Sequence, residues 1–255
     1  MFRVVIPARY DSTRLPGKAL SEIAGKPMVQ WVYERARAAG AREVLIATDD
    51  ELIISAAHAF GAPAELTARE HASGTDRIAE VARRHRWAED ELIVNVQGDE
   101  PLIPVALIRQ VGALLVEHPQ AHIGTLATAI ESLAEFTDPN AVKVVTDASG
   151  RALYFSRAPI PCNREAASAS GPRDFSGARR HVGIYAYRVG ALLRLAALPQ
   201  TALEVREKLE QLRALEHGLA IQVADALERP GPDVNTLADL ERVSALLARA
   251  APESR

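Results

Sequence analysis

The 255-residue sequence contains a single cysteine, Cys162, which excludes an internal disulfide and a zinc site built from several cysteines. It also lacks an excess of charge of either sign, because 30 Lys and Arg residues stand against 33 Asp and Glu, a formal net charge of −3. A nearly neutral chain gives no sign of a nucleic-acid-binding surface, so its basic residues must act locally. One free cysteine is consistent with a reducing compartment.

Long hydrophobic runs are also missing, since no apolar segment approaches the roughly 18 residues of a membrane-spanning helix. Arg3 and Arg9 interrupt the N-terminal apolar segment too early for a signal peptide. Aromatic residues make up only 5% of the chain, whereas apolar residues make up 48% and charged residues 25%. These proportions are typical of a globular protein, and we expect a cytoplasmic one whose partners are neither nucleic acids nor membranes.

Apolar runs of strand length alternate with helical periodicity along the first 130 residues. Pro7 is expected to end the first strand, and Gly40 and Gly61 are expected to end the first two helices. The expected strands are 2–6, 43–47, 91–96 and 123–130, and the expected helices are 27–40, 51–60, one that opens at 71–77, and 104–117. This order is typical of a mostly parallel sheet with helices on both faces, in which right-handed crossovers place the strand ends along one edge.

The pattern changes from β-α to β-β after residue 130. Segments 141–147 and 152–156 flank a turn as a hairpin, and 182–187 is a further strand. We therefore expect 130–190 to be an antiparallel β subdomain inserted in the α/β body, within which the polar segment 163–180 is either a lid or a plain surface excursion. The remaining elements are expected to be a helix over 202–217, a strand over 219–224 and a helix over 237–249.

A basic loop follows the first strand. Arg9, Arg14 and Lys18 place three cations within it, and Gly17 gives it backbone freedom. A buried strand that runs into such a loop favours an anion site at the edge of an α/β sheet, and three cations suit a polyphosphate better than a single carboxylate. The alternative is an ordinary solvated surface loop.

The segment His71 to Arg77, HASGTDR, opens the next helix. Ser73 with Asp76 three residues later is a capping box, which is a sufficient structural reason for both residues. The functional interpretation is that a ligand binds at the N-terminus of this helix, beside Gly74 and Thr75. Arg77 would lie one helical turn further along. The two interpretations are compatible.

Two carboxylates, Asp99 and Glu100, follow the expected strand 91–96 within the sequence QGDEP. The carboxyl end of a central parallel strand is where ligands bind in this architecture. Magnesium is usually held by one or two carboxylates together with substrate phosphates, so we expect a Mg²⁺ site at Asp99. Taken alone, QGDEP could also be a plain turn, with Gly98 for backbone freedom and Pro101 to start a helix.

The ordered motifs resemble those of a known family over nearly the whole chain. They are IPARYDSTRLPGK, HASGTDR, NVQGDEP, NAVKVV, ALYFSRAPIP, HVGIYAYR, LEQLR and DLERV. Together they resemble the 3-deoxy-manno-octulosonate cytidylyltransferase (CMP-Kdo synthetase) family, in which 3-deoxy-D-manno-octulosonate (Kdo) and CTP give CMP-Kdo and pyrophosphate for lipopolysaccharide synthesis. The resemblance implies one Rossmann-like nucleotidyltransferase domain over 1–255, magnesium as cofactor, and a homodimer formed through the inserted β region.

The same resemblance implies roles for individual residues. The CTP-binding residues would be Arg9, Arg14, Lys18, Ser73, Gly74, Thr75 and Arg77. The Kdo-binding residues would be Gln97, Arg157, Arg164, His181, Tyr185, Glu210 and Gln211. Arg9, Lys18 and Asp99 would be catalytic, and Asp99 and Asn235 would be the magnesium ligands.

One departure from the family pattern concerns the metal. The family usually reads G-V-D-T where this chain has Asp233-Val234-Asn235-Thr236, so an amide replaces the Asp that is the second magnesium ligand. An amide oxygen can ligate a hard cation but carries no charge, which predicts weaker magnesium binding. The departure leaves two alternatives open: a related 2-keto sugar acid as substrate, such as 8-amino-Kdo or sialic acid, or a weakly active nucleotide-binding homologue.

Overall fold

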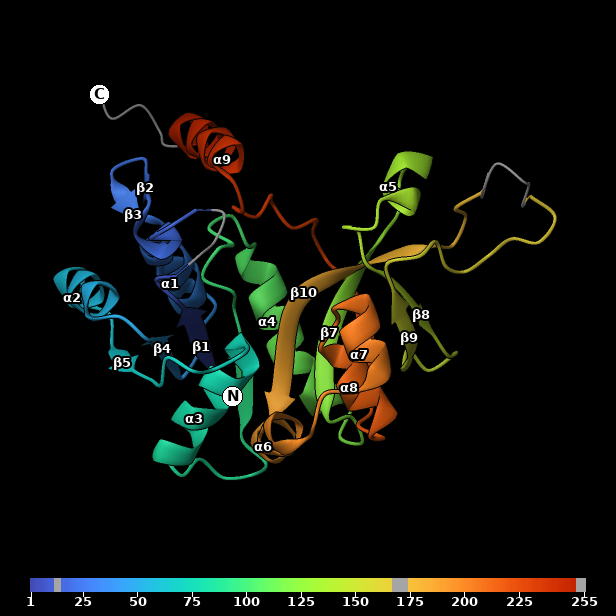
Figure 1. Cartoon of the computed structure of the whole chain (residues 1–255), viewed down its shortest axis with the longest axis horizontal. Helices are drawn as coiled ribbons and strands as arrows, with labels where there is room; N and C mark the ends of the chain where they lie inside the picture. The colour runs from blue at the N-terminus through green and yellow to red at the C-terminus, as the bar shows by residue number, and fades with distance from the viewer. Residues whose placement is uncertain (12–14, 167–173, 251–255) are drawn as a thin grey trace.

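A single sheet runs through the protein, described by a computed structural model that covers residues 1–11, 15–166 and 174–250. In the described residues its strands follow the order β11-β7-β10-β6-β1-β4-β5, with β8 and β9 attached beside β10 (Figure 1). The strands are β1 (Phe2–Ala8), β4 (Glu43–Thr48), β5 (Ala64–Leu66), β6 (Leu92–Asn95), β7 (Ile123–Ala129), β8 (Lys143–Thr146), β9 (Ala152–Ser156), β10 (Arg179–Arg188) and β11 (Ile221–Asp225). Two short strands, β2 (Glu22–Ile23) and β3 (Lys26–Pro27), pair separately.

Helices cover both faces of this sheet. They are α1 (Met28–Ala38), α2 (Glu51–Ala59), α3 (Gly74–Arg84), α4 (Val105–Glu117), α5 (Leu133–Thr137), α6 (Val189–Ala197), α7 (Ala202–Glu207), α8 (Gln211–Glu216) and α9 (Leu237–Ala250), with a 3-10 turn η1 (Lys18–Leu20). Among the described helices, none is long and apolar enough to cross a membrane.

The two faces are built by the alternation of side chains along each strand. Val4 and Ile6 of β1 belong to the cluster that includes α1, α2 and α4, whereas Val5 belongs to the opposite cluster with α3, α6 and α8. All three side chains are fully buried. The predicted α/β class, with a mostly parallel sheet and helices on both faces, is confirmed.

Parallel register brings the strand ends together. β1 pairs in parallel with β4, from Arg3↔Glu43 to Ala8↔Thr48, and in parallel with β6, ending at Val5↔Asn95. The residues that follow these three strands therefore lie at one edge of the sheet.

The prediction that Pro7 ends the first strand is wrong. β1 continues through Pro7 to Ala8, which still pairs with Thr48 of β4. The pairing of β1 with β6 has already ended at Val5, whose carbonyl faces β6, and the backbone nitrogen of Pro7 faces the same side. A missing N–H is tolerated there because no partner strand remains to accept from it.

The region 130–190 contains the expected antiparallel hairpin, β8 with β9, which pairs with the first residues of β10. β10 then continues into the main sheet, where it runs antiparallel between β6 and β7. Arg179 and Arg180 thus belong to β10 rather than to the polar segment 163–180, and the suggested lid falls partly on 167–173, outside the described residues. The division into body and subdomain, and the homodimer, stay predictions.

The single helix predicted over 202–217 is wrong, because the chain forms two short helices. α7 ends at Glu207, Lys208 adopts the left-handed conformation with φ of 55°, and α8 begins at Gln211. The guanidinium of Arg157 donates from Nε to the carbonyl of Glu207 at 2.6 Å and so satisfies the end of α7. A partner that directly follows β9, about 50 residues earlier in the chain, therefore supports this break, which local helical periodicity does not reveal.

Arg213 joins the two short helices, and we predict that Arg213→Met destabilises the fold. Its Nε donates to Glu204 Oε2 at 2.8 Å, and the two side chains are only 7% and 6% exposed. Removal of the guanidinium leaves the Glu204 carboxylate buried without its charge partner, which costs about 3–5 kcal/mol of unfolding free energy. Urea denaturation followed by circular dichroism measures this loss. Arg206→Met, at an exposed site on α7, is the matched control, and an equal loss in both variants would contradict the prediction.

Candidate active site

Polar side chains gather where β1, β4 and β6 end. Arg9 follows β1, Asp49 follows β4, and Gln97 to Asp99 follow β6. Two cavities open at this edge. The first, here called the β1 cavity, has a volume of about 280 Å³ and is lined by residues of the β1 loop, the start of α3, the end of β6 and the segment before α9. The second, the β10 cavity, has a volume of about 370 Å³ and is lined mainly by residues of β6, β10 and the start of α8.

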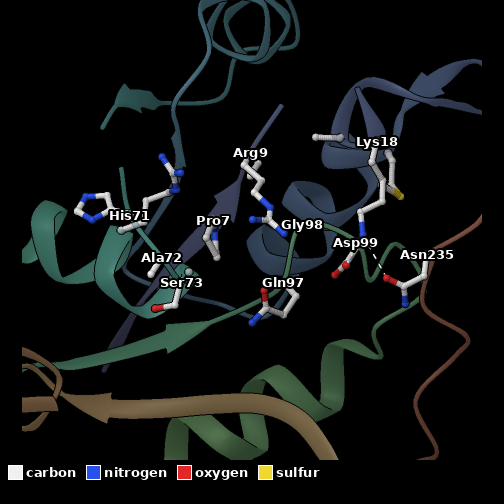
Figure 2. Close-up of a pocket in the computed structure, with 15 residues that line it drawn as sticks. Pro7, Arg9, Lys18, His71, Ala72, Ser73, Gln97, Gly98, Asp99 and Asn235 are labelled. Carbon is white, nitrogen blue, oxygen red and sulfur yellow. Dashed lines mark hydrogen bonds and ion pairs between the residues drawn. The ribbon is translucent and has the colours of Figure 1, made fainter. Parts of the chain in front are cut away.

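A lysine and two oxygen donors meet in the β1 cavity. Lys18 Nζ lies 2.6 Å from Asp99 Oδ2 and 3.4 Å from Asn235 Oδ1. Figure 2 shows these three side chains at one end of the cavity, Ser73 at the other, and the exposed Arg9 between them. The structure therefore brings Arg9, Lys18, Asp99 and Asn235 together as the sequence predicted, whereas Arg14 lies outside the described residues.

The start of α3 forms the wall opposite Lys18. Ser73 is its N-cap, and the capping box with Asp76 is present as expected. Ser73 and Gly74 line the β1 cavity, whereas Thr75 faces the β10 cavity and donates its hydroxyl proton to Glu210. Arg77 lines the β1 cavity, but its buried guanidinium donates to Asp49 Oδ2 at 2.7 Å. Its charge is therefore already paired within the protein.

Aromatic rings, uncharged polar groups and the carboxyl groups of Asp99, Glu100, Glu210 and Asp233 line the β10 cavity. The rings of Phe155, His181, Tyr185 and Tyr187 follow one another with centroids 5.0 to 5.8 Å apart. Burial, with a smaller effect of Arg180, lowers the pKa of His181 to about 3, so the ring is neutral near pH 7.

The tautomer of His181 follows from its hydrogen bonds. Thr125 Oγ1 lies 2.9 Å from His181 Nε2 and 2.8 Å from the carbonyl oxygen of Ile184. The carbonyl oxygen of Val182 also lies 3.1 Å from Thr125 Oγ1. Carbonyls only accept, so the single hydroxyl proton of Thr125 is directed at these two oxygens and Nε2 of the imidazole donates to Thr125. The Nδ1 atom is left as an acceptor.

The break between α7 and α8 brings Glu210 and Gln211 to the β10 cavity. Burial raises the pKa of Glu210, although the Thr75 hydroxyl and the nearby Arg213 oppose that change. Glu210 Oε1 is enclosed and accepts no hydrogen bond in the described structure. The cavity thus presents unused polar capacity to a polyhydroxylated ligand.

Comparisons with known proteins identify the family of this chain. A model of the cytidylyltransferase family matches residues 3–221. The chain is 53% identical over 246 residues to the 3-deoxy-manno-octulosonate cytidylyltransferase of Thioalkalivibrio sulfidiphilus and 55% identical over 248 residues to that of Pseudomonas fluorescens, with 96% of this chain and 98% of each relative covered. The chain belongs to the 3-deoxy-manno-octulosonate cytidylyltransferase family.

A solved structure agrees over its full length. The structure of CMP:2-keto-3-deoxy-manno-octonic acid synthetase complexed with CTP superposes with a TM-score of 0.88 at 44% identity, covering 98% of this chain and 100% of that one. The family resemblance stated from the motifs is therefore confirmed.

Two residues that the family resemblance assigned to the sugar do not reach either cavity. Arg157 donates to backbone carbonyls, including that of Pro139 at 2.8 Å, and thereby supports the α7–α8 break. Arg164 is exposed beyond β9. The other five, Gln97, His181, Tyr185, Glu210 and Gln211, all line the β10 cavity.

Sequence reasoning missed several lining residues of this family member. Asn95, Tyr187, Glu100 and Asp233 also line the β10 cavity. Burial, with the charges of Asp99 and Asp233, raises the pKa of Glu100 to about 8, and its Oε2 accepts no hydrogen bond in the described structure. Tyr187 could have been found from its spacing of two from Tyr185, which places both on one face of a strand. Asp233 required the tertiary fold.

Gly98 separates Gln97 from Asp99, and its role is to allow a close approach. A Cβ atom there would lie 2.9 Å from the carbonyl oxygen of Pro7 and 3.4 Å from Ala8 Cβ. The contact is with strand β1, in which Pro7 and Ala8 are paired with Ala47 and Thr48 of β4. Backbone freedom in a turn, the reason inferred from the sequence, is therefore not the main constraint.

We predict that Gly98→Ala lowers the unfolding free energy by about 1–3 kcal/mol, because the added methyl overpacks the contact between β1 and the end of β6. Urea denaturation measures the change. Gly183→Ala is the matched control, since the nearest atom to its new Cβ would be Glu100 Oε1 at 3.9 Å. Equal stabilities of the two variants would contradict the steric argument.

Proposed function

We propose that this chain transfers CMP from CTP to Kdo, giving CMP-Kdo and pyrophosphate for lipopolysaccharide synthesis. The observation that carries the proposal is that Gln97, Asp99 and Asn235 line both cavities. Two substrates in adjoining cavities meet at these residues, which places their reacting groups next to each other.

The β1 cavity suits CTP. Arg9 and Lys18 supply cations for phosphate oxygens, and the N-terminus of α3 offers backbone N–H groups beside Ser73. Gly98 keeps the end of β6 close to β1, so a nucleotide can approach the backbone there. The relative of known structure that is 44% identical was solved with CTP.

The β10 cavity suits the sugar acid. Tyr185, Gln211 and the neutral His181 can bind hydroxyl groups by hydrogen bonds without bringing an unpaired charge. Glu210 adds an oxygen, Oε1, that accepts no hydrogen bond in the described structure and lies 3.7 Å from Arg213 Nη2. Aromatic faces give the carbon skeleton an apolar surface.

In the reaction, a bond forms between the anomeric oxygen of Kdo and the α-phosphorus of CTP. The bond between that phosphorus and the oxygen bridging to the β-phosphate breaks, pyrophosphate leaves with the bonding electrons, and the hydroxyl proton is released. Positioning and charge neutralisation suffice for transfer of this kind, so the protein needs no covalent nucleophile. Arg9 and Lys18 would neutralise the charge that develops on the pyrophosphate.

Magnesium fits the boundary between the cavities. Asp99 and Asn235 already direct two hard oxygen donors at one cation, the ammonium of Lys18. Magnesium is usually held by one or two carboxylates together with substrate phosphates. Among the described residues, no group of three or more His, Cys, Asp or Glu could hold a metal ion. Asp99 and Asn235 would hold the ion, which when bound neutralises phosphate charge and lowers the pKa of a nearby hydroxyl.

Pyrophosphate release from CTP tests the function directly. We expect release with Kdo at a higher kcat/KM than with 8-amino-Kdo or sialic acid, and none without an acid. A preference for one of the other two acids would reassign the substrate. No release with any acid over a magnesium series would contradict the enzymatic proposal.

We predict that Asn235→Asp lowers the magnesium concentration for half-maximal rate, because a second carboxylate raises the affinity of an oxygen site for a hard cation. Calorimetric titration of magnesium into the protein with CTP provides a readout independent of turnover. Asn140→Asp adds the same charge to an exposed turn outside both cavities and is the control. Identical magnesium curves for both variants would place Asn235 away from the metal.

A further inference from the structure

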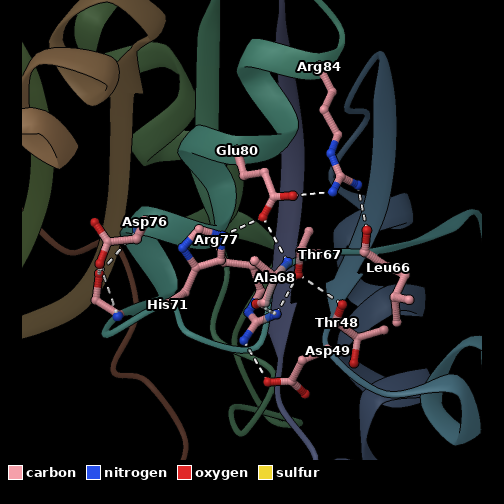
Figure 3. Close-up of polar contacts among 11 residues, drawn as sticks. Thr48, Asp49, Leu66, Thr67, Ala68, His71, Asp76, Arg77, Glu80 and Arg84 are labelled. Atoms are coloured by element: carbon pink, nitrogen blue, oxygen red, sulfur yellow. Dashed lines mark hydrogen bonds and ion pairs between the residues drawn. The ribbon is translucent and has the colours of Figure 1, made fainter.

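A row of charged side chains on α3 holds the wall of the β1 cavity in place. Arg77, Glu80 and Arg84 are spaced by three and four residues, so they share one face of the helix. All three point at the segment 66–71, which links β5 to α3 (Figure 3). We call these three side chains the α3 ladder.

Glu80 is the centre of the α3 ladder. Its Oε2 accepts the backbone N–H of Ala68 at 2.9 Å and also contacts Nε2 of His71, while Arg84 binds Oε1. The carboxylate is only 17% exposed. Burial by itself would raise the pKa of Glu80, but His71, the Ala68 amide and Arg84 hold it below the usual range, so the group is an ionised acceptor.

The segment held by Glu80 makes few backbone hydrogen bonds of its own. Within the described structure, no backbone–backbone hydrogen bond is made by the N–H groups of residues 68–72. The N–H of Ser73 is also held by a side chain of α3, that of Asp76. His71, Ala72 and Ser73 all line the β1 cavity, so this wall depends on side chains of α3 for its position.

The first residue of the α3 ladder extends the connection to the basic loop. Arg77 Nη2 binds Asp49 Oδ2 at 2.7 Å, and Asp49 Oδ1 accepts the backbone N–H of Tyr10 at 3.1 Å. Tyr10 is the neighbour of Arg9 in the chain. Both walls of the β1 cavity, the one after β1 and the one before α3, are therefore tied to the same helix face.

We propose that Glu80 is a positioning residue for nucleotide binding: through Ala68 and His71 it fixes the segment that forms one wall of the β1 cavity. The inference rests on the proposed function, because it takes CTP as the occupant of that cavity. Glu80 itself does not line the cavity, so it acts through the segment rather than on the ligand. Its effect should therefore appear in CTP affinity and not in the chemical step.

The test compares Glu80→Ala with Arg83→Ala, which removes an exposed side chain from the same helix that makes no contact with the segment. We expect Glu80→Ala to raise both the Kd and the KM for CTP about tenfold, as the loss of hydrogen bonds to a charged group implies. The kcat and the KM for Kdo should stay within about twofold of the parent, because the lost interaction serves ground state and transition state equally. Arg83→Ala should match the parent throughout.

Two further measurements separate positioning from general weakening. Without ligand, amide hydrogen exchange in Glu80→Ala should accelerate in 68–73 and stay unchanged in α4. In a double-mutant cycle with exchange in 68–73 as the readout, His71→Ala should add little to Glu80→Ala, because both remove the same anchor. Unchanged CTP affinity, a fall in kcat at constant KM, exchange accelerated equally in α4, or additive effects would each overturn the proposal. Absence of pyrophosphate release by the parent protein would instead contradict the proposed function, while the exchange measurement would still test the α3 ladder.

Discussion

The parallel pairing of β1 with both β4 and β6 is the constraint on which the rest of the structure depends. It aligns three strand ends at one edge, so that Arg9, Asp49 and Gln97 start from neighbouring points although 88 residues separate the first from the last. The close approach of Gly98 to the Pro7 carbonyl then fixes where the segment after β6 lies relative to β1. Asp99 faces Lys18 because both residues emerge from this edge, one through the end of β6 and one through the β1 loop and η1.

Charge at this edge is arranged before any ligand arrives. Lys18 Nζ lies between Asp99 Oδ2 and Asn235 Oδ1, so a divalent ion at these two oxygens would compete with the lysine. Arg9 lines the same cavity. The guanidinium of Arg77 is paired with Asp49 instead, so Arg77 supports the cavity wall without adding to the net charge of the cavity. The β10 cavity differs in kind, since aromatic rings, amides and carboxyl groups line it, its lining contains no Lys or Arg, and burial keeps His181 neutral. Adjoining cavities of opposite character suit a reaction between a phosphate-rich and a hydroxyl-rich substrate.

Much of this could be predicted from the sequence, and the limits have physical reasons. The capping box at Ser73 and the buried strand before Gln97 are local patterns, and both are found as expected. The sequence does not show that β1 continues through Pro7. Proline is tolerated within a strand only where the neighbouring strand no longer pairs with it, and the pairing of β1 with β6 is a property of the whole sheet. Arg157 was assigned to the sugar by family resemblance, yet a guanidinium can equally satisfy helix-end carbonyls, and only the fold decides between the two uses. The cavity partners Glu100 and Asp233 come from segments more than 130 residues apart, which no local spacing connects.

The two arginine results together suggest how this site keeps its shape. Arg157 holds the α7–α8 break from which Glu210 and Gln211 reach the β10 cavity, and Arg77 with Glu80 holds the segment that walls the β1 cavity. In each case residues that line a cavity follow an irregular segment whose backbone groups lack partners in regular structure, so a partly buried charged side chain supplies them. A charged group is used because its hydrogen bonds are stronger than neutral ones, and one side chain can hold several backbone groups at once. Motifs around such a site therefore contain positioning residues as well as ligand-binding ones, and Glu80 and Arg157 are recognised as positioning residues because they bond to the backbone of the segments that they hold.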